Sequence, residues 1–217
     1  RRLLNILDSM QPPSGGFLEA TPLTAFVAMS LTDCIGPQQS VVERCHTFLR
    51  DQMRPDGSWP IDANLSVWVT TSALHALYES GGSPDEMNTR EWIRLRQTRS
   101  IHPFTGAAPG GWPWTHHSGG VPDADDTSGA ILTLGHQAST PDEADTTAIT
   151  RGTRWLLDLQ NRDGGWPTFC RGWGKLPFDK SCPDITAHAL RALSTEAISS
   201  GARVQRAMTD GISYLRE

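Results

Sequence analysis

The sequence predicts an all-α protein, built as an α/α toroid (a partial α/α barrel) of about four helix pairs. Three observations support this fold class: a helical pattern that recurs four times, a Gly-rich turn with an aromatic residue inside each pair, and a polarity that alternates between successive helices. Such alternation is typical of solvated outer helices wrapped around buried inner ones. The 217 residues can form one sizeable core, so we expect 1–217 to be a single domain.

Each repeat is expected to begin with an outer helix that carries Arg, Glu and Asp on one face. These helices end near a glutamine, at Gln11, Gln52, Gln97 and Gln160. Glycine in the turn that follows supplies the positive φ that ends a helix. The predicted outer helices are 3–11, 41–53, 89–98 and 148–160, and 203–216 starts a fifth repeat.

The second helix of each pair is richer in Ala, Leu, Val and Thr, as expected of a buried inner helix. If outer and inner helices alternate, all inner helices run in the same direction and their N-termini gather at one end. Trp68, the acidic segment 123–126, and Asp184 with His188 lie near those N-termini, so we expect them to line one cavity. The predicted inner helices are 21–31, 65–78, 125–136 and 184–193.

Composition excludes several classes of protein. The net charge of −5 and the scattered acidic residues argue against a nucleic-acid partner. No apolar run approaches the ~18 residues that span a bilayer. The four cysteines have no C-x-x-C spacing, which favours free thiols in a reducing compartment such as the cytoplasm.

Three carboxylates occur within four residues, at Asp123, Asp125 and Asp126. Helix capping accounts for one or two of them. Since three packed carboxylates cannot all ionise cheaply, at least one pKa should be raised, and Asp125, flanked by the others, is the candidate general acid. His188 is expected to donate to its other oxygen, and Asp184, four residues earlier on the same helix face, to orient the imidazole.

Aromatic residues near the same end supply a second ingredient. The faces of Trp68, Trp114, Trp166 and Phe169 can stabilise a positive charge that grows in a dry pocket. An acid on one wall, surrounded by aromatic faces, is suited to generating and steering carbocations.

The repeats and two short segments resemble a known family. The Gln…Gly-x-Trp turns are similar to the QW motifs of triterpene cyclases, and Asp-Ala-Asp-Asp-Thr at 123–127 resembles the D-x-D-D-T signature of class II terpene cyclases. Pro-Asp-Ile-Thr-Ala-His at 183–188 resembles a second segment of squalene–hopene cyclases. Because the family's catalytic barrel has about six helix pairs, the resemblance implies that this chain is a fragment of a larger (α/α)6 barrel domain.

The resemblance also assigns roles to the acidic residues. It implies that Asp125 protonates a terminal alkene, that Asp123 and Asp126 support it, that His188 is its hydrogen-bond partner, and that Asp184 belongs to the same network. The substrate would be squalene or a related linear polyprene, and neither a cofactor nor a metal is expected. A polyprene substrate also implies peripheral membrane association of the intact protein.

The aromatic positions match the family less completely. Trp68 resembles an aromatic that lines the cyclase cavity, and Trp114 falls where the family places a cation-stabilising aromatic. Phe169 lies three residues after Trp166, where squalene–hopene cyclases usually carry a tyrosine. Val69 follows Trp68 where the family often has an acid.

Two alternatives remain open from the sequence. One is a zinc-dependent, prenyltransferase-like protein that uses Asp184 and His188 with Cys182 or Cys170 as ligands. The other is a non-catalytic helical repeat that binds a partner on its concave face, which leaves the Asp cluster without a role. Taken alone, His188 is typical of a satisfied core histidine, and Trp166 of a structural residue in a repeat turn.

Overall fold

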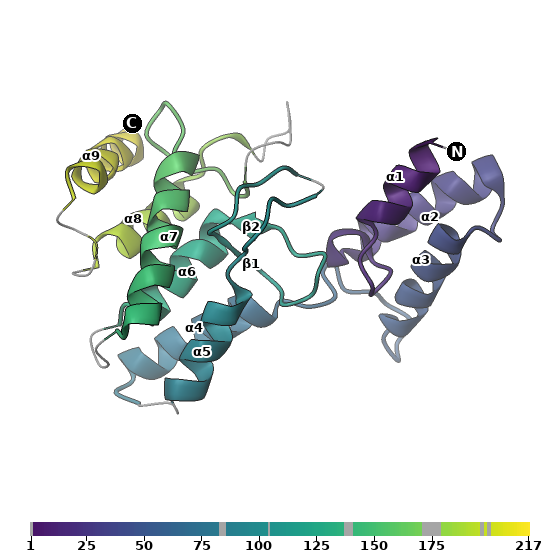
Figure 1. Cartoon of the computed structure of the whole chain (residues 1–217), viewed down its shortest axis with the longest axis horizontal. Coiled ribbons are helices and arrows are strands. Elements are labelled where there is room, and N and C mark those ends of the chain that lie inside the picture. Colours follow the sequence, from purple (N-terminus) through teal and green to yellow (C-terminus); the bar gives the residue numbers. More distant parts are fainter. Residues whose placement is uncertain are drawn as a thin grey trace. The chain divides into compact units, whose positions relative to one another are not determined.

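The computed structural model (Figure 1) describes residues 2–82, 86–103, 105–136, 141–170, 179–195, 198 and 201–217. These residues contain nine α-helices, one 3-10 helix and one two-stranded sheet. None of the helices described is both long and apolar enough to cross a membrane. The chain divides into two compact units, one formed by Arg1–Leu65 with Thr115–Gly120 and the other by Ser66–Trp114 with Val121–Glu217.

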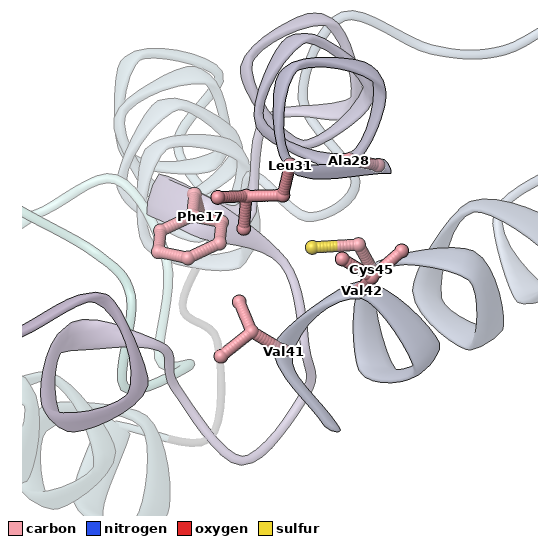
Figure 2. Close-up of a cluster of buried hydrophobic side chains, with 6 residues drawn as sticks. All are labelled: Phe17, Ala28, Leu31, Val41, Val42 and Cys45. Atoms are coloured by element: carbon pink, nitrogen blue, oxygen red, sulfur yellow. The ribbon is translucent and has the colours of Figure 1, made fainter. Parts of the chain in front are cut away.

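The first unit is a small helical cluster. Helix α2 packs against α3, and α1 also contacts α3. A core of buried apolar side chains joins α2 and α3 with the short η1 turn, as Figure 2 shows. The elements are α1 (Arg2–Met10), η1 (Phe17–Glu19), α2 (Thr21–Ile35) and α3 (Ser40–Asp51), and the core residues are Phe17, Ala28, Leu31, Val41, Val42 and Cys45.

The second unit has two layers of helices. Helix α6 packs against α4 on one side and α8 on the other, so these three form the inner layer. Helices α5, α7 and α9 form the outer layer, in which α7 contacts both α5 and α9. The elements are α4 (Ser66–Glu79), α5 (Glu86–Arg96), β1 (Trp112–Pro113), β2 (Pro122–Asp123), α6 (Ala124–Leu134), α7 (Glu143–Leu159), α8 (Pro183–Leu193) and α9 (Ala202–Arg216).

The predicted all-α class is confirmed, and every predicted helix is present. The clearest difference is the start of α7, which lies five residues before the predicted position at 148. Asp142 causes this early start, because its side chain caps the helix by accepting a hydrogen bond from the Asp145 amide at 2.7 Å. The β1–β2 hairpin was not predicted. All four cysteines are free thiols, as expected.

The glutamines at the ends of the outer helices form hydrogen bonds to the next outer helix. In three repeats the side-chain amide donates both of its hydrogens, one to a glycine carbonyl of its own turn and one to a carbonyl of the following outer helix. Gln97, for example, bonds Gly110 O at 2.8 Å and Ala148 O at 2.9 Å. The equivalent acceptors are Gly15 and Val41 for Gln11, and Gly164 and Ala207 for Gln160.

In three repeats the aromatic residue of the turn is bonded to an inner helix through a threonine hydroxyl. The amide of Trp112 donates to Thr127 Oγ1 at 2.9 Å, and that of Trp166 donates to Thr186 Oγ1 at 2.9 Å. Each threonine is the fourth residue of its helix. The same bond, from the Phe17 amide to Thr24, occurs in the first unit. A hydroxyl at this position therefore links the repeat turn to the start of α2, α6 and α8.

The two hydrogen bonds donated by the Gln97 side chain predict a large effect of this residue on stability. Gln97→Ala should lower the free energy of unfolding by about 2 kcal/mol, because two buried carbonyl groups lose their donor. Thermal or urea unfolding of this chain measures the change. Gln38→Ala, at an exposed glutamine, is the control and should have almost no effect. Equal stability of Gln97→Ala and the parent chain would show that the glutamine does not tie the outer helices together.

Candidate active site

Three side chains from three inner helices meet at Asp125. Its Oδ1 lies 2.5 Å from Nδ1 of His188 on α8, and its Oδ2 accepts a hydrogen bond of 3.0 Å from the indole Nε1 of Trp68 on α4. The contacts join residues 63 and 57 positions apart in the sequence. All three lie in the first two turns of their helices, so the N-terminal ends of α4, α6 and α8 do gather at one place.

The N-terminus of α6 is built by the cap and the hairpin that precede it. Asp123 is the N-cap, and its Oδ1 accepts from the Asp126 amide at 2.8 Å. The same residue pairs with Trp112 in the β1–β2 hairpin. Asp123 is therefore held by its backbone and its side chain together, and it fixes the position of Asp125, two residues further on.

Trp114 connects this hairpin to the neighbouring inner helix. Its carbonyl oxygen accepts from the amides of Val67 at 3.0 Å and Trp68 at 3.3 Å, two of the orphan donors at the start of α4. Its ring meets that of Phe169 edge to face, with the centroids 6.0 Å apart. The structure thus places Trp114 and Phe169 side by side, and Trp114 also helps to hold Trp68 in position.

The electrostatics of the three carboxyl groups correct one prediction. The hydrogen bond from His188 is the main cause that lowers the pKa of Asp125, and the Trp68 N–H acts in the same direction. Burial raises the pKa of Asp126 to about 7, and burial together with the nearby Asp126 charge raises that of Asp123 well above its usual range. The prediction that Asp125 holds the raised pKa is wrong, because two donors stabilise its anion while its neighbours lie in the interior.

Asp123 and Asp126 form a buried pair behind Asp125. Burial raises the pKa of both carboxyl groups, so simultaneous ionisation of the two is disfavoured. Oδ1 of Asp126 is buried and has no hydrogen-bond partner among the described residues. The raised pKa values favour retention of a proton by this pair, which reduces the negative charge that Asp125 faces there.

Asp184 has a different partner from the one predicted. Its Oδ1 accepts from the thiol of Cys182 at 2.7 Å, and this bond is the main cause that lowers its pKa. No hydrogen bond or ion pair joins it to His188 in the described part of the chain. Its charge still acts on the site, because it opposes ionisation of Asp125.

Trp166 does not fit the predicted role of a cavity-lining aromatic. The side chain is 0% exposed, and its Nε1 donates to Leu156 O at 2.8 Å. It packs so closely on α9 that a Cβ at Gly211 would lie 2.9 Å from the ring. Trp112 is buried in the same way, with its Nε1 on Ile93 O at 2.7 Å. The tryptophan of the repeat turn is therefore a structural residue in both repeats.

The sequence analysis missed the structural role of two threonines. Thr127 closes the acidic signature and Thr186 lies inside the second segment, and each anchors a repeat turn to an inner helix. The signal was present, since each is the third residue of a predicted inner helix, 125–136 or 184–193. Thr24 is the fourth residue of the predicted helix 21–31 and makes the same bond. Comparing the repeats position by position would have identified all three.

The zinc alternative lacks a set of ligands. Among the described residues, no group of three or more His, Cys, Asp or Glu side chains could hold a metal ion. Cys170 is buried, the Cys182 thiol bonds Asp184, and Nδ1 of His188 faces Asp125.

The raised pKa of Asp126 predicts how stability depends on pH. The pKa of an Asp in the unfolded chain is about 3.9, and that of Asp126 in the folded chain is about 7. Between these pH values the folded state binds more protons than the unfolded state. The free energy of unfolding therefore falls as pH rises. Asp126→Asn should flatten this dependence and raise stability at pH 8 by about 1 to 3 kcal/mol.

Urea unfolding at pH 4, 6 and 8 measures the difference, with Asp33→Asn at an exposed aspartate as the control. If Asp126→Asn is less stable than the parent chain at pH 8, the folded chain stabilises the ionised form of Asp126, and the prediction is wrong.

Comparison with known proteins gives a consistent result. A probable squalene–hopene cyclase of Sinorhizobium fredii is 29% identical over 171 residues, covering 69% of this chain and 26% of the relative. The squalene–hopene cyclase of Alicyclobacillus acidocaldarius is 26% identical over 182 residues, covering 74% and 28%. The drimenyl diphosphate synthase of Streptantibioticus cattleyicolor is 26% identical over 170 residues, covering 74% and 30%.

The chain thus spans between a quarter and a third of the length of these relatives. Residues 65–217 match the family described as the squalene-hopene cyclase C-terminal domain. This match includes all of α4 to α9, and with them Trp68, Asp125 and His188. The chain belongs to the squalene–hopene cyclase family.

Proposed function

We propose that the intact protein is a class II terpene cyclase, which protonates an alkene of squalene or a related linear polyprene and closes rings through carbocations. One observation carries this proposal: a carboxyl group at the N-terminal end of the inner helices has a hydrogen-bond partner on each of its two oxygens. Membership of the family supports the same reading.

The two partners make Asp125 a strong acid. An alkene is a very weak base, so the carboxylate that remains after proton transfer must be stabilised. His188 and Trp68 stabilise that carboxylate, and the lowered pKa of Asp125 expresses the same effect. In the proposed step the O–H bond of Asp125 breaks, a C–H bond forms at one alkene carbon, and the positive charge remains on the other.

The buried pair of Asp123 and Asp126 limits the negative charge beside this acid. Two ionised carboxylates there would hold the proton on Asp125 more tightly and weaken it as a donor. Since burial raises the pKa of both groups, the pair adds less negative charge than two ionised carboxylates would. Asp184, bonded to Cys182, lies outside this pair and adds a further negative charge near the site.

Aromatic rings provide the surface for the cation. Trp114 and Phe169 are in edge-to-face contact, and an aromatic face attracts a positive charge without forming a bond to it. The absence of a hydroxyl at Phe169 keeps this part of the wall free of a nucleophile. We place Trp68, Trp114 and Phe169 along the substrate path and assign Trp166 to the core of the repeat.

The family and its members support the proposed substrate class. Relatives include squalene–hopene cyclases and a drimenyl diphosphate synthase, and linear polyprenes are the shared chemistry we propose for this protein. We also propose that it works in the cytoplasm with peripheral contact to a membrane, because a polyprene partitions into lipid.

Asp125→Asn in the intact protein tests the proposal. An amide cannot donate an acidic proton, so cyclised product from squalene and shorter polyprenes should fall at least about a hundredfold, measured by mass analysis of extracts. Asp158→Asn, at an exposed aspartate of α7, is the matched control and should retain activity. Circular dichroism should show that both variants are folded.

If Asp125→Asn cyclises substrate at the parent rate, Asp125 is not the acid. Loss of product in both variants would point to general damage. If the parent protein makes no product while Asp125→Asn changes only stability, the chain is better described as a binding repeat.

A further inference from the structure

Trp68 presents its indole N–H, and not its ring face, to the acid. The N–H lies 3.0 Å from Oδ2 of Asp125. We propose that this N–H is a fixed donor that strengthens Asp125 as an acid, so that Trp68 acts on proton transfer as well as on substrate binding. The inference rests on the proposed function, in which Asp125 protonates an alkene.

The direction of this hydrogen bond is settled by chemistry. An indole nitrogen carries a hydrogen and no available lone pair, so it can only donate, and Oδ2 must accept. The partner on Oδ1 is different, because the donor or acceptor role of each His188 ring nitrogen depends on its tautomer. Asp125 therefore has one partner whose role depends on its tautomer and one, the indole, that can only donate.

The backbone of Trp68 is held on both sides. Its amide donates to Trp114 O at 3.3 Å, and its carbonyl accepts from the Thr71 hydroxyl at 3.1 Å. The first bond fixes the start of α4 to the strand that leads into the site, and the second closes the next turn. The side chain is 45% exposed, so packing alone does not hold the indole, and the bond to Asp125 sets its direction.

Gly129 allows α4 and α8 to approach the acid together. It lies one turn after Asp125 on α6, where an added Cβ would be 3.0 Å from Thr71 Oγ1 and 3.8 Å from His188 Cε1. A side chain here would push α4 outward and lengthen the bond from Trp68. The small residue on α6 thus brings both donors within reach of one carboxyl group.

Trp68 differs from the charged and titratable groups around Asp125 because it is a neutral hydrogen-bond donor. His188 and Asp184 face it from α8, and Asp123 and Asp126 flank it in the sequence. On α4 the residue next to Trp68 is Val69, which is apolar and exposed. Trp68 is therefore a neutral donor from α4, whose imidazole and carboxyl side chains, His75 and Glu79, lie later in the helix, and burial lowers the pKa of His75 to about 4. The charge of Asp184 opposes ionisation of Asp125.

The test measures the acid itself. Carbon-13 NMR of this chain, with labelled aspartate carboxyl groups and Asp125→Asn to assign the signal, follows the titration of Asp125. In Trp68→Phe the ring remains but the donor is lost, so the pKa of Asp125 should rise. Trp59→Phe is the matched control, because Trp59 is 47% exposed and its Nε1 donates to Leu49 O. There the pKa of Asp125 should stay unchanged.

A second variant covers the case in which Trp68→Phe fails to fold. Replacing Trp68 by benzothienylalanine keeps the two-ring shape and substitutes sulfur for N–H, and the pKa of Asp125 should rise again. An unchanged pKa of Asp125 in folded chains of both variants would overturn the inference.

The kinetics of cyclisation by the intact protein provide an independent test. Trp68→Phe should lower kcat on the order of three- to tenfold, with KM nearly unchanged, because a donor to the conjugate base is lost while the aromatic face remains. A fall confined to KM would assign Trp68 to substrate binding alone. If the NMR shift is found but the intact parent protein cyclises nothing, the donor role stands and the proposed function fails.

Discussion

The parallel packing of α4, α6 and α8 is the constraint on which the site depends. Helices that run side by side in one direction bring their N-terminal residues to one place, even when these are about sixty residues apart in the sequence. Thr127 and Thr186 link repeat turns to the start of α6 and α8, and the β1–β2 hairpin directly precedes α6. The motif residues meet because each lies in the first two turns of its inner helix.

Burial and hydrogen bonding then separate three carboxyl groups that look alike in the sequence. Asp123 and Asp126 lie in the interior, where the charged form is disfavoured, and burial raises the pKa of both. Asp125 lies at the edge of the interior, and His188 and Trp68 stabilise its anion. The same segment therefore contains a proton-holding pair and a strong acid. In the outer layer, the hydrogen bonds of Gln97 and Gln160 hold together the helices that surround these inner helices.

Periodicity predicted the helices well, because amphipathic patterns and Gly-rich turns are local signals. It did not predict the start of α7, which depends on the Asp142 cap, or the β1–β2 hairpin, which is only two residues per strand. The motifs indicated which residues would converge, yet the lowered pKa of Asp125 depends on donors from two other helices. Trp166 was misplaced because a sequence does not show whether an aromatic in a turn faces a cavity or the core.

The central claim is that a proton from Asp125 becomes part of the product. The most direct measurement is to incubate the intact protein with squalene and shorter polyprenes in deuterated water and to locate deuterium in the cyclised product. We expect one non-exchangeable deuterium per molecule, at the end where ring closure begins, because Asp125 exchanges with solvent between turnovers. Cyclised product without deuterium at that end would contradict it.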